Sequence, residues 1–402
     1  MFSLLVAGSL LLASLPCHAQ IWEQSDASTN FTWQSIACSA NGNKLCAAAS
    51  DDGYGDGGPV YLSTNSGTTW MQTTAPTNCT WQSVASSTNA NTLVAAVYQD
   101  ADGNPGTLYV STNAGTTWRA PTSPSNLWAS VAASASGVKL VAADSGNGDG
   151  LIYTSTNSGK SWTATSAPAN FWASVASSAD GSKLVAVDSG YGDGLIYLST
   201  DSGATWIATS APANSWTCVA SSATGSNLVA ANSSYGDDLI YLSTNAGSTW
   251  IATSATTNQW ASVACSADGT QLAAADSGYG DGLIYISTNS GVTWTATGAP
   301  VEFWTCIVSS ADGSKLTATA TPGGIFTFQV IPTLNISPLN GRLSMSWQAL
   351  SSATGLTLQQ NTNVAATNWT TVTNVPAQTN GQYQVNLPLA PTGNKFYRLT
   401  AP

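Results

Sequence analysis

The sequence predicts an all-β protein: a seven-bladed β-propeller closed by its own N-terminal strand, followed by a small β-sandwich. An eight-residue motif, STNSGTTW at residues 63–70, returns in near-copies that begin at residues 111, 155, 199, 243 and 287. A second tryptophan recurs in phase with this motif, and the period stops near residue 330. A fixed period of about 44 residues indicates a repeat architecture before any single residue is considered.

Residues 1–19 have the features of a secretory signal peptide. An apolar run covers residues 4–15, and Cys17 and Ala19 put small residues at the two positions that a signal peptidase inspects. We predict cleavage after Ala19, because Pro16 disfavours the alternative of a lipidated Cys17. Later segments fall short of the ~18 consecutive apolar residues that a membrane span needs. The sequence therefore predicts no membrane span and a secreted, periplasmic or extracellular location.

The only histidine, His18, lies inside this signal. We therefore expect the mature chain to lack Ser/His/Asp and Cys/His mechanisms and His-ligated metal sites. All 20 acidic residues precede residue 331. The same part of the chain, after the signal, contains only six basic residues. Such an acidic surface repels phosphate backbones, so nucleic acid is excluded as a partner class.

Each repeat unit is predicted to contain four short strands. The first strand follows a tryptophan, the second and third resemble residues 184–187 and 195–198, and the fourth surrounds the tryptophan of the motif. Four strands in each unit favour a propeller blade over a solenoid with one strand per repeat. The strand-opening tryptophans are Trp33, Trp81, Trp128, Trp172, Trp216, Trp260 and Trp304.

The N-terminal strand is predicted to complete the last blade. The seventh unit has a third strand at residues 324–328 but no motif and no fourth strand after it. Residues 21–30 have the phase of a fourth strand, because Trp22 precedes Trp33 by the same interval as Trp70 precedes Trp81. We therefore assign residues 20–330 to one closed ring without an open sheet edge.

STNSGTTW and its copies resemble the Asp-box, or BNR, repeat of sialidase-like propellers, whose pattern is Ser-x-Asp-x-Gly-x-Thr-Trp. The Asp position holds Asp201 in one copy and Asn in the other five. The resemblance implies a structural hairpin between the third and fourth strands, on the face away from the active site. The function of that family is not expected here, because its substrate-binding arginine triad is absent: Arg119 is the only arginine of the repeat region.

A short linker at residues 331–333 precedes a segment of a different kind. Residues 334–402 alternate apolar and polar side chains and predict about six short strands in a small β-sandwich. This segment resembles the fibronectin-III-like or Ig-like modules that are often appended to secreted bacterial proteins.

Six cysteines remain after the signal, an even count that predicts disulfides in an exported protein. Cys218 and Cys306 follow their strand-opening tryptophans by two residues, whereas Cys265 and Cys38 follow theirs by five. Opposite parity places these pairs on opposite faces of the first strands. The predicted bonds across blade junctions are Cys218–Cys265 and Cys306–Cys38, which leaves Cys46–Cys79 as a third.

Binding residues are expected in the loops between second and third strands, typified by DSGYGDG at residues 188–194. Asp side chains that cap Gly-rich turns are the simplest explanation of these loops. Contact with a glycan is an alternative, as is Ca²⁺ at Asp188, Asp193, Asp276 and Asp281. No other cofactor is predicted. The candidate ligand-binding residues are Asp51, Tyr54, Asp56, Asp144, Asp149, Asp188, Tyr191, Asp193, Tyr235, Asp237, Tyr279 and Asp281.

A second set of residues lies just before each strand-opening tryptophan, and six are Asn while the last is Glu302. Turn chemistry explains the asparagines. Glu302, with Asp281 or Asp276, is the candidate catalytic pair of a glycoside hydrolase other than a sialidase. The sequence favours a secreted, non-catalytic binding or scaffold propeller with a glycan or an extracellular protein as ligand. That hydrolase and an extracellular assembly or adhesion factor are the alternatives.

Overall fold

The computed structural model describes residues 20–51, 57–233, 238–278 and 282–330 of the repeat region. Beyond it, residues 334–339, 342–348, 357–363, 366, 368–379, 382–388 and 395–400 are described. The chain divides into two compact units, one spanning Trp22–Phe328 and the other containing the described residues from Gln329 onward. Within the described part of the chain, no helix has the length and apolar character needed to cross a membrane.

The first unit consists of repeated sheets, most of them four-stranded, as the period predicts. Each sheet is named below after its first strand. In chain order the described sheets are β2-β3-β4-β5 (Thr32–Cys38, Leu45–Asp51, Val60–Ser63, Met71–Gln72), β6-β7-β8 (Cys79–Ser86, Leu93–Asp100, Leu108–Ser111), β9-β10-β11-β12 (Trp128–Ala133, Leu140–Asp144, Ile152–Ser155, Thr163–Ala164), β13-β14-β15-β16 (Trp172–Ser177, Leu184–Asp188, Ile196–Ser199, Ile207–Ala208), β17-β18-β19-β20 (Trp216–Ser221, Leu228–Asn232, Ile240–Ser243, Ile251–Ala252), β21-β22-β23-β24 (Trp260–Cys265, Leu272–Asp276, Ile284–Ser287, Thr295–Ala296) and β25-β26-β27-β1 (Trp304–Ser309, Lys315–Ala320, Gly324–Val330, Gln20–Gln24).

The core of this unit lies in layers between neighbouring sheets. All five residues of β14 are buried, and the same holds for β10, β18 and β22. A strand covered on both faces needs no alternation of apolar and polar side chains. One such layer joins Val185 of β14 to Trp216 and Val219 of β17.

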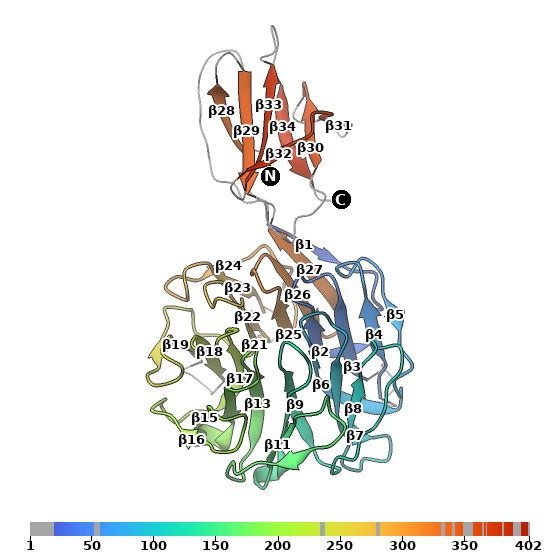
Figure 1. The fold of residues 1–402 in the computed structure, drawn as a ribbon, viewed down its shortest axis with the longest axis vertical. Coiled ribbons are helices and arrows are strands. Elements are labelled where there is room, and N and C mark those ends of the chain that lie inside the picture. The colour runs from blue at the N-terminus through green and yellow to red at the C-terminus, as the bar shows by residue number, and fades with distance from the viewer. Residues whose placement is uncertain are drawn as a thin grey trace. The chain divides into compact units, whose positions relative to one another are not determined.

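Serine side chains on the first strands connect each sheet to the next. The hydroxyl of Ser174 in β13 accepts a hydrogen bond from the backbone N–H of Val219 in β17, at 3.3 Å. The first strands lie toward the middle of the unit, whereas β5 and β16 lie at its rim (Figure 1). The same contact joins Ser35 to Val84, Ser83 to Val131, Ser130 to Val175 and Ser262 to Ile307.

A second series of contacts runs through the turns between first and second strands. In each turn a backbone N–H donates to a carbonyl oxygen in the turn of the next sheet, at 2.7–2.9 Å. The β2 and β25 strands are also in contact with each other. In order, the donors and acceptors are Ala40, Thr88, Ala135, Ala179, Ala223, Ala267 and Ala311, and Ala311 donates back to Ala40.

The strand-opening tryptophans are fully buried and pack at the junctions between sheets. The indole N–H of Trp216 donates to the carbonyl oxygen of Gly194 in the preceding sheet, at 3.1 Å. Its ring packs edge-on against Tyr241 of the third strand, with centroids 5.2 Å apart and planes at 74°. This edge-to-face geometry is favourable for aromatic pairs, so the tryptophan stabilises its own sheet and the junction together.

The STNSGTTW motif forms the turn between the third and fourth strands. In the first copy, Asn65 Oδ1 accepts from the N–H of Thr69, at 2.9 Å, and Asn65 Nδ2 donates to the Thr69 hydroxyl, also at 2.9 Å. In the single Asp copy, Asp201 accepts from both groups of Thr205, at 2.8 and 2.7 Å. Asn therefore keeps the backbone contact of Asp and only reverses the direction of the second hydrogen bond.

The second sheet departs from the predicted four strands. It has three named strands, and only a single bridge joins Val110 of β8 to Arg119. In the β13 sheet, the N–H of Thr209 donates to Ile196 of the third strand. Pro121 occupies the position of Thr209 and has no N–H to donate, so the outer strand does not continue.

β1 is the outermost strand of the last sheet, next to β27. The N–H of Ser25 donates to the carbonyl oxygen of Ile325, at 2.9 Å. The ring of Trp22 lies against Phe328, with centroids 5.1 Å apart, and its indole N–H donates to the Thr297 hydroxyl at 3.0 Å. The N-terminal strand thus occupies the place that fourth strands hold in the other sheets.

The predicted disulfides are not present, because all six cysteines are free thiols in this structure. Two of them occupy a repeated serine position. Cys218 and Cys306 stand where Ser174 stands in β13, and the backbones of Val263 and Ile36 in the next sheets hydrogen-bond to their thiols. These cysteines therefore substitute for serine in the contacts between sheets.

The other pairings fail for similar reasons. The Cys265 thiol donates to the carbonyl oxygen of Ser266, at 3.2 Å, as the Ser221 hydroxyl does to Ser222 in the preceding sheet. The Cys38 thiol donates to the carbonyl oxygen of Ser309, at 3.2 Å, although Cys306 packs against the same apolar cluster and adds to the raised pKa of Cys38. Burial raises the pKa of Cys38 and of Cys265 to about 12, which keeps both thiols protonated.

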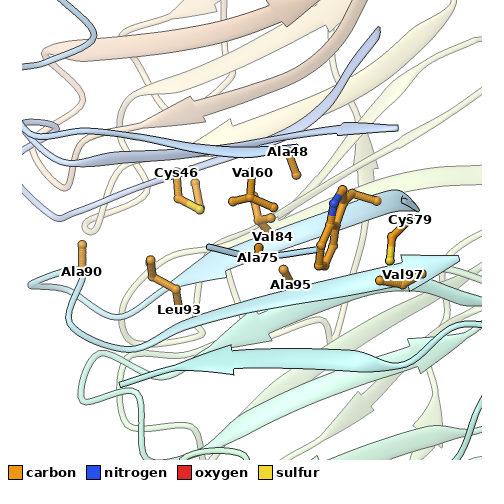
Figure 2. Close-up of a cluster of buried hydrophobic side chains, with 12 residues drawn as sticks. Cys46, Ala48, Val60, Ala75, Cys79, Val84, Ala90, Leu93, Ala95 and Val97 are labelled. Carbon is orange, nitrogen blue, oxygen red and sulfur yellow. The ribbon is translucent and has the colours of Figure 1, made fainter. Parts of the chain in front are cut away.

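Cys46 and Cys79 belong to one buried apolar cluster. They lie at its opposite ends, with Val60 and Val84 between them (Figure 2). Burial raises the pKa of Cys46 to about 12 and that of Cys79 to about 11. Both therefore act as small apolar residues at this junction.

The second unit is a two-sheet arrangement with its own core. Its sheets share Met345 and Trp347 from one side with Leu358 and Leu399 from the other. The sequence predicts about six strands, and the described residues form seven. The sheets are β28-β29-β33-β32 (Asn335–Leu339, Arg342–Gln348, Gln382–Pro388, Ala377–Thr379) and β31-β30-β34 (Thr370–Thr371, Thr357–Asn361, Phe396–Thr400).

Candidate functional site

The candidate site lies where two kinds of segment meet. These are the loops between second and third strands and the connectors that lead from one sheet to the next; together they are called the loop face. The N–H of Asn214 in a connector donates to Gly194 in the loop of the preceding sheet, at 2.9 Å, and Glu302 donates to Gly282 at 3.2 Å. The predicted loop residues and the predicted connector residues are therefore neighbours at the junctions between sheets.

The loop face is acidic. Fifteen of the 20 acidic residues lie in these segments or at the ends of the second strands that lead into them, and none of the nine basic residues does. Four lysines, Lys44, Lys139, Lys183 and Lys315, instead connect sheets at the opposite face. Lys183 Nζ donates to the carbonyl oxygen of Thr224, at 2.9 Å, and Lys315 Nζ donates to Asn43 Oδ1, at 2.7 Å. A cationic ligand is therefore attracted to the loop face and not to the opposite one.

Three of the predicted aspartates, Asp144, Asp188 and Asp276, are buried at the ends of second strands. Asp188 Oδ1 accepts a hydrogen bond from the N–H of Gly190, at 3.1 Å, and the other two cap their turns in the same way. Burial raises the pKa of Asp188 and of Asp144, although the capping N–H groups oppose this shift. Capping chemistry therefore accounts for these three residues.

The β17 sheet holds an uncharged equivalent, Asn232, which is fully buried. Its Nδ2 donates to Asn214 Oδ1, at 2.9 Å, and its Oδ1 accepts from the N–H of Leu239, at 2.8 Å. Asn170 stands in the place of Asn214 in the β13 sheet, and its Nδ2 is buried without a hydrogen-bond partner. The junction that contains Asp188 therefore leaves a buried donor without a hydrogen bond, whereas Asn232 forms hydrogen bonds through both atoms of its amide.

Asp51 is not equivalent to Asp188, contrary to the alignment of the loops by sequence. In the β13 sheet Asp188 pairs with Trp172, whereas in the β2 sheet Trp33 pairs with Ala49 and Asp51 pairs with Thr32. The loop after β3 is longer than the loop after β14, so matching the Asp-Gly letters shifts the register. Ala49 is the true counterpart of the buried aspartate.

The loop after β14 brings two carboxylates together. It contains the short helix η2 (Gly190–Gly192), and Asp193 follows it with an exposed side chain. A methyl group on Gly190 would lie 3.1 Å from Asp193 Oδ1 and 3.5 Å from Asp188 Oδ2. The charge on Asp193 adds to the raised pKa of Asp188, after burial. The equivalent loop of the β9 sheet contains η1 (Gly146–Gly148), and there Gly146 meets only Asp144.

The Glu302 side chain lies beside the second and third strands of its own sheet. A methyl group on Gly323 would lie 2.8 Å from Glu302 Oε2 and 3.1 Å from Ala320 Cβ. Ala320 pairs with Trp304 and so occupies the place of the buried aspartates in this sheet. Asp276, the other described candidate, caps Gly278 at 2.9 Å. Ala320 thus replaces the buried aspartate beside Glu302, and the other predicted partner, Asp281, lies outside the described residues.

The remaining candidate residues are partly described. Asp149 and Asp193 are described, and both side chains are exposed. Several others fall outside the described part of the chain. Within the described residues, no three His, Cys, Asp or Glu side chains are grouped as metal ligands. The calcium site therefore stays a prediction, and one of its four members is undescribed. The undescribed candidates are Tyr54, Asp56, Tyr235, Asp237, Tyr279 and Asp281, together with the side chain of Tyr191.

The residue immediately before each strand-opening tryptophan, which directly follows Asn170, Asn214 and Glu302 in their connectors, was not singled out from the sequence. Phe171 holds this position in the β13 sheet, Ser215 in the β17 sheet and Phe303 in the β25 sheet, where the ring is exposed. The signal that could have found this position is the change from aromatic to small and back within one repeat column.

Comparisons with known proteins support the fold. No family model and no curated protein sequence matches the chain. Among solved structures it is similar to a GH74 xyloglucanase from Xanthomonas campestris, with a TM-score of 0.61 and 14% identity over 82% of this chain and 60% of that one. It is also similar to YCF48 bound to D1 peptide, with a TM-score of 0.58 and 15% identity over 79% of this chain and 96% of that one. Both are propellers, so the repeat region of this chain has a β-propeller fold. At these identities the likeness shows the fold alone.

Proposed function

We propose that the chain is an exported, non-catalytic binding or scaffold propeller whose ligand, a glycan or an extracellular protein, docks on the loop face. The observation that carries this proposal is the division of charge: the loop face collects carboxylates, while four lysines connect sheets at the opposite face. Exposed Asp149 and Asp193 are then free to contact a ligand. One propeller neighbour is a glycoside hydrolase and the other was solved with a bound peptide, so both ligand classes are compatible with the fold.

The proposal includes a ring of seven blades closed by β1, with Asp-box hairpins between third and fourth strands. The hydrogen-bonded series that runs from Ala311 back to Ala40 supports the closure. The Asn65 and Asp201 turns support the assignment of the hairpins. The proposed organisation is a signal peptide at residues 1–19, the ring at 20–330 and a fibronectin-III-like or Ig-like module at 331–402.

Carboxylate substitutions on two faces test the site. The loop-face variant combines Asp149→Asn, Asp193→Asn and Glu302→Gln. The matched control removes the same number of charges from the opposite face by Asp→Asn at residues 180, 268 and 312, where Asn41 and Asn89 hold the equivalent positions in other sheets. Binding to a panel of polysaccharides and of cationic peptides is measured at low and high salt. We expect the loop-face variant to lose binding and the control to retain it; the reverse result would place the ligand elsewhere.

The same panel separates binding from catalysis. Reducing-sugar release from each polysaccharide reports hydrolysis, and the proposal expects none. Turnover that disappears in Glu302→Gln would overturn the non-catalytic assignment and establish the glycoside hydrolase instead. N-terminal sequencing of the protein recovered outside the cytoplasm tests export, with a mature chain that begins at Gln20 as the expected result.

A further inference from the structure

Phe303 is the only exposed aromatic residue among those whose side chains the structure describes. It is 42% exposed, and Val301 in the same connector is 54% exposed. Phe31, in the connector before Trp33, is partly buried instead, because its ring packs against Trp33 and Tyr61 with centroids 5.5 and 5.8 Å apart. Within the described part of the chain no aromatic ring contacts Phe303 in this way. The loop face therefore presents one unpaired aromatic ring.

The backbone that carries this ring is held on both sides. The N–H of Glu302 donates to the carbonyl oxygen of Gly282, at 3.2 Å, and the carbonyl oxygen of Phe303 accepts from the N–H of Thr321, at 3.0 Å. The indole N–H of Trp304 donates to the same oxygen of Gly282, at 3.2 Å. A ligand that binds Phe303 therefore does not have to order this segment, which lowers the cost of binding.

Glu302 places a carboxylate between the two exposed apolar residues. Asn214 holds this position in the β17 sheet, where its Oδ1 accepts a hydrogen bond from Asn232 at 2.9 Å. Ala320 stands in the place of Asn232 in the β25 sheet, and among the described residues no donor is hydrogen-bonded to the Glu302 carboxylate. A carboxylate accepts hydrogen bonds and donates none, so it suits a ligand that carries donors.

The neighbouring loop favours a neutral ligand at this position. The loop between β14 and β15 comprises residues 189–195 and contains Asp193, whereas the loop between β26 and β27 comprises only residues 321–323, none of them charged. This loop therefore adds no carboxylate beside Glu302. A cationic ligand is attracted more strongly to the loops that carry aspartates.

We propose that Phe303, Val301 and Glu302 form a subsite for one pyranose ring of a neutral polysaccharide. The apolar C–H face of the sugar lies on the exposed phenyl ring and on the valine, and hydroxyl groups at its edge donate to the Glu302 carboxylate. An apolar surface with a few placed polar groups is typical of small-ligand sites. An apolar side chain of a protein partner would cover Phe303 equally well but would leave the carboxylate without a donor. This inference rests on the proposed function, because it names the ligand class at one position of the loop face.

Phe303→Ala tests the subsite. Binding of the full chain to a β-glucan and a galactomannan, both neutral, and to the cationic peptides is measured at low and high salt. We expect Phe303→Ala to weaken binding of a neutral polysaccharide about tenfold, as loss of one aromatic contact does. Phe303→Trp keeps an aromatic surface and should retain binding. The matched control, Ile251→Ala, removes an exposed apolar side chain from β20, outside the loop face, and should leave binding unchanged.

Salt and charge give two independent readouts. Binding of a neutral sugar forms no ion pair, so it should be nearly equal at low and high salt. Glu302→Gln keeps the shape of the side chain but removes its charge, and it should weaken binding several-fold because hydrogen bonds to a charged acceptor are stronger. Thermal melting of each variant establishes that it is folded.

The outcomes separate this subsite from the proposed function. Polysaccharide binding that Phe303→Ala leaves unchanged would refute the subsite while leaving the loop face as a binding surface. Binding confined to the cationic peptides and lost at high salt would also refute it, and would assign the acidic loops to a charged partner. Failure of every polysaccharide and peptide to bind would contradict the proposed function itself.

Discussion

Replacing Asp188 with Asn should stabilise the protein. The β17 sheet shows the outcome, because Asn232 stands at the same position, is fully buried and donates to Asn214 Oδ1 at 2.9 Å. In the β13 sheet the substituted amide can donate in the same way to Asn170. One neutral hydrogen bond contributes about 0.5–1.5 kcal/mol. For a unit of this size the corresponding rise in Tm is roughly 2 °C.

The gain should depend on pH. Burial raises the folded-state pKa of Asp188 above its ordinary value of 3.8, so the folded chain binds this proton more tightly than the unfolded chain does. Wild-type stability therefore falls as pH rises through the folded-state pKa, and the neutral variant lacks that loss. We expect the difference in Tm between Asp188→Asn and wild type to be larger at pH 7 than at pH 4.

The reverse substitution provides the control. Asn232→Asp removes the donor to Asn214 and places a charge in a site that is fully buried. We expect it to lower the free energy of unfolding by about 1–3 kcal/mol at pH 7. Differential scanning calorimetry of the two variants and wild type measures both shifts. A lower Tm for Asp188→Asn, or an unchanged Tm for Asn232→Asp, would show that the two junctions are not equivalent.

Two further predictions concern the turns and the thiols. Hydrogen bonds from Thr205 lower the pKa of Asp201 from 3.8 to about 2. Its ionised form therefore contributes stability above pH 3.8 that is lost as pH falls toward 2. Asp201→Asn should flatten the acid limb of the Tm–pH curve, and an unchanged limb would contradict this. Cys218→Ser and Cys306→Ser should leave Tm nearly unchanged, because Ser174 makes the same contact, and thiol titration of the denatured wild type should find six reactive groups; a count of zero would restore the disulfides.

The propeller fold could be predicted because the period constrains every unit at once. Trp172 and its counterparts mark the first strands, and the motif marks the turn before each fourth strand, so strand number and order follow from spacing. The exception, the second sheet, depends on the single residue Pro121. Its missing N–H matters only once the contact that needs it is known, and that contact is seen from Thr209 to Ile196 in the β13 sheet.

The predicted cysteine bonds are not seen in this structure, and parity along a strand says only which face a side chain leaves, not what it meets. Cys218 shares a repeat column with Ser174, and comparison of that column would have indicated a hydrogen-bonding role. The register of Asp51 was wrong for a different reason. Matching letters in a loop ignores inserted residues, whereas the strand pairing of Ala49 with Trp33 does not.

The difference between Phe171 and Ser215 was visible in the sequence, yet its meaning required the structure. A column that changes from aromatic to small is ordinary surface variation until the ring is seen to cover Gly148. At the next junction the equivalent Gly192 follows Tyr191, whose side chain lies outside the described part of the chain, so only the first junction shows what this column does. Undescribed loop residues, such as Tyr279 and Asp281, give no comparable test at the later junctions.

The repeated sheets act as internal controls for what the packing of one sheet on the next requires. Ala49, Asn232 and Ala320 occupy the buried position that Asp188 holds, so a charge there is not needed to build a sheet or to join it to its neighbour. Burial nevertheless raises the pKa of Asp188 and makes its ionised form a cost to folding. The cap on Gly190 needs only a side-chain oxygen, so an amide at this position keeps the turn and removes the charge. The same substitution, Asp188→Asn, should therefore raise Tm, and an unchanged or lower Tm would show that the charge itself stabilises this junction.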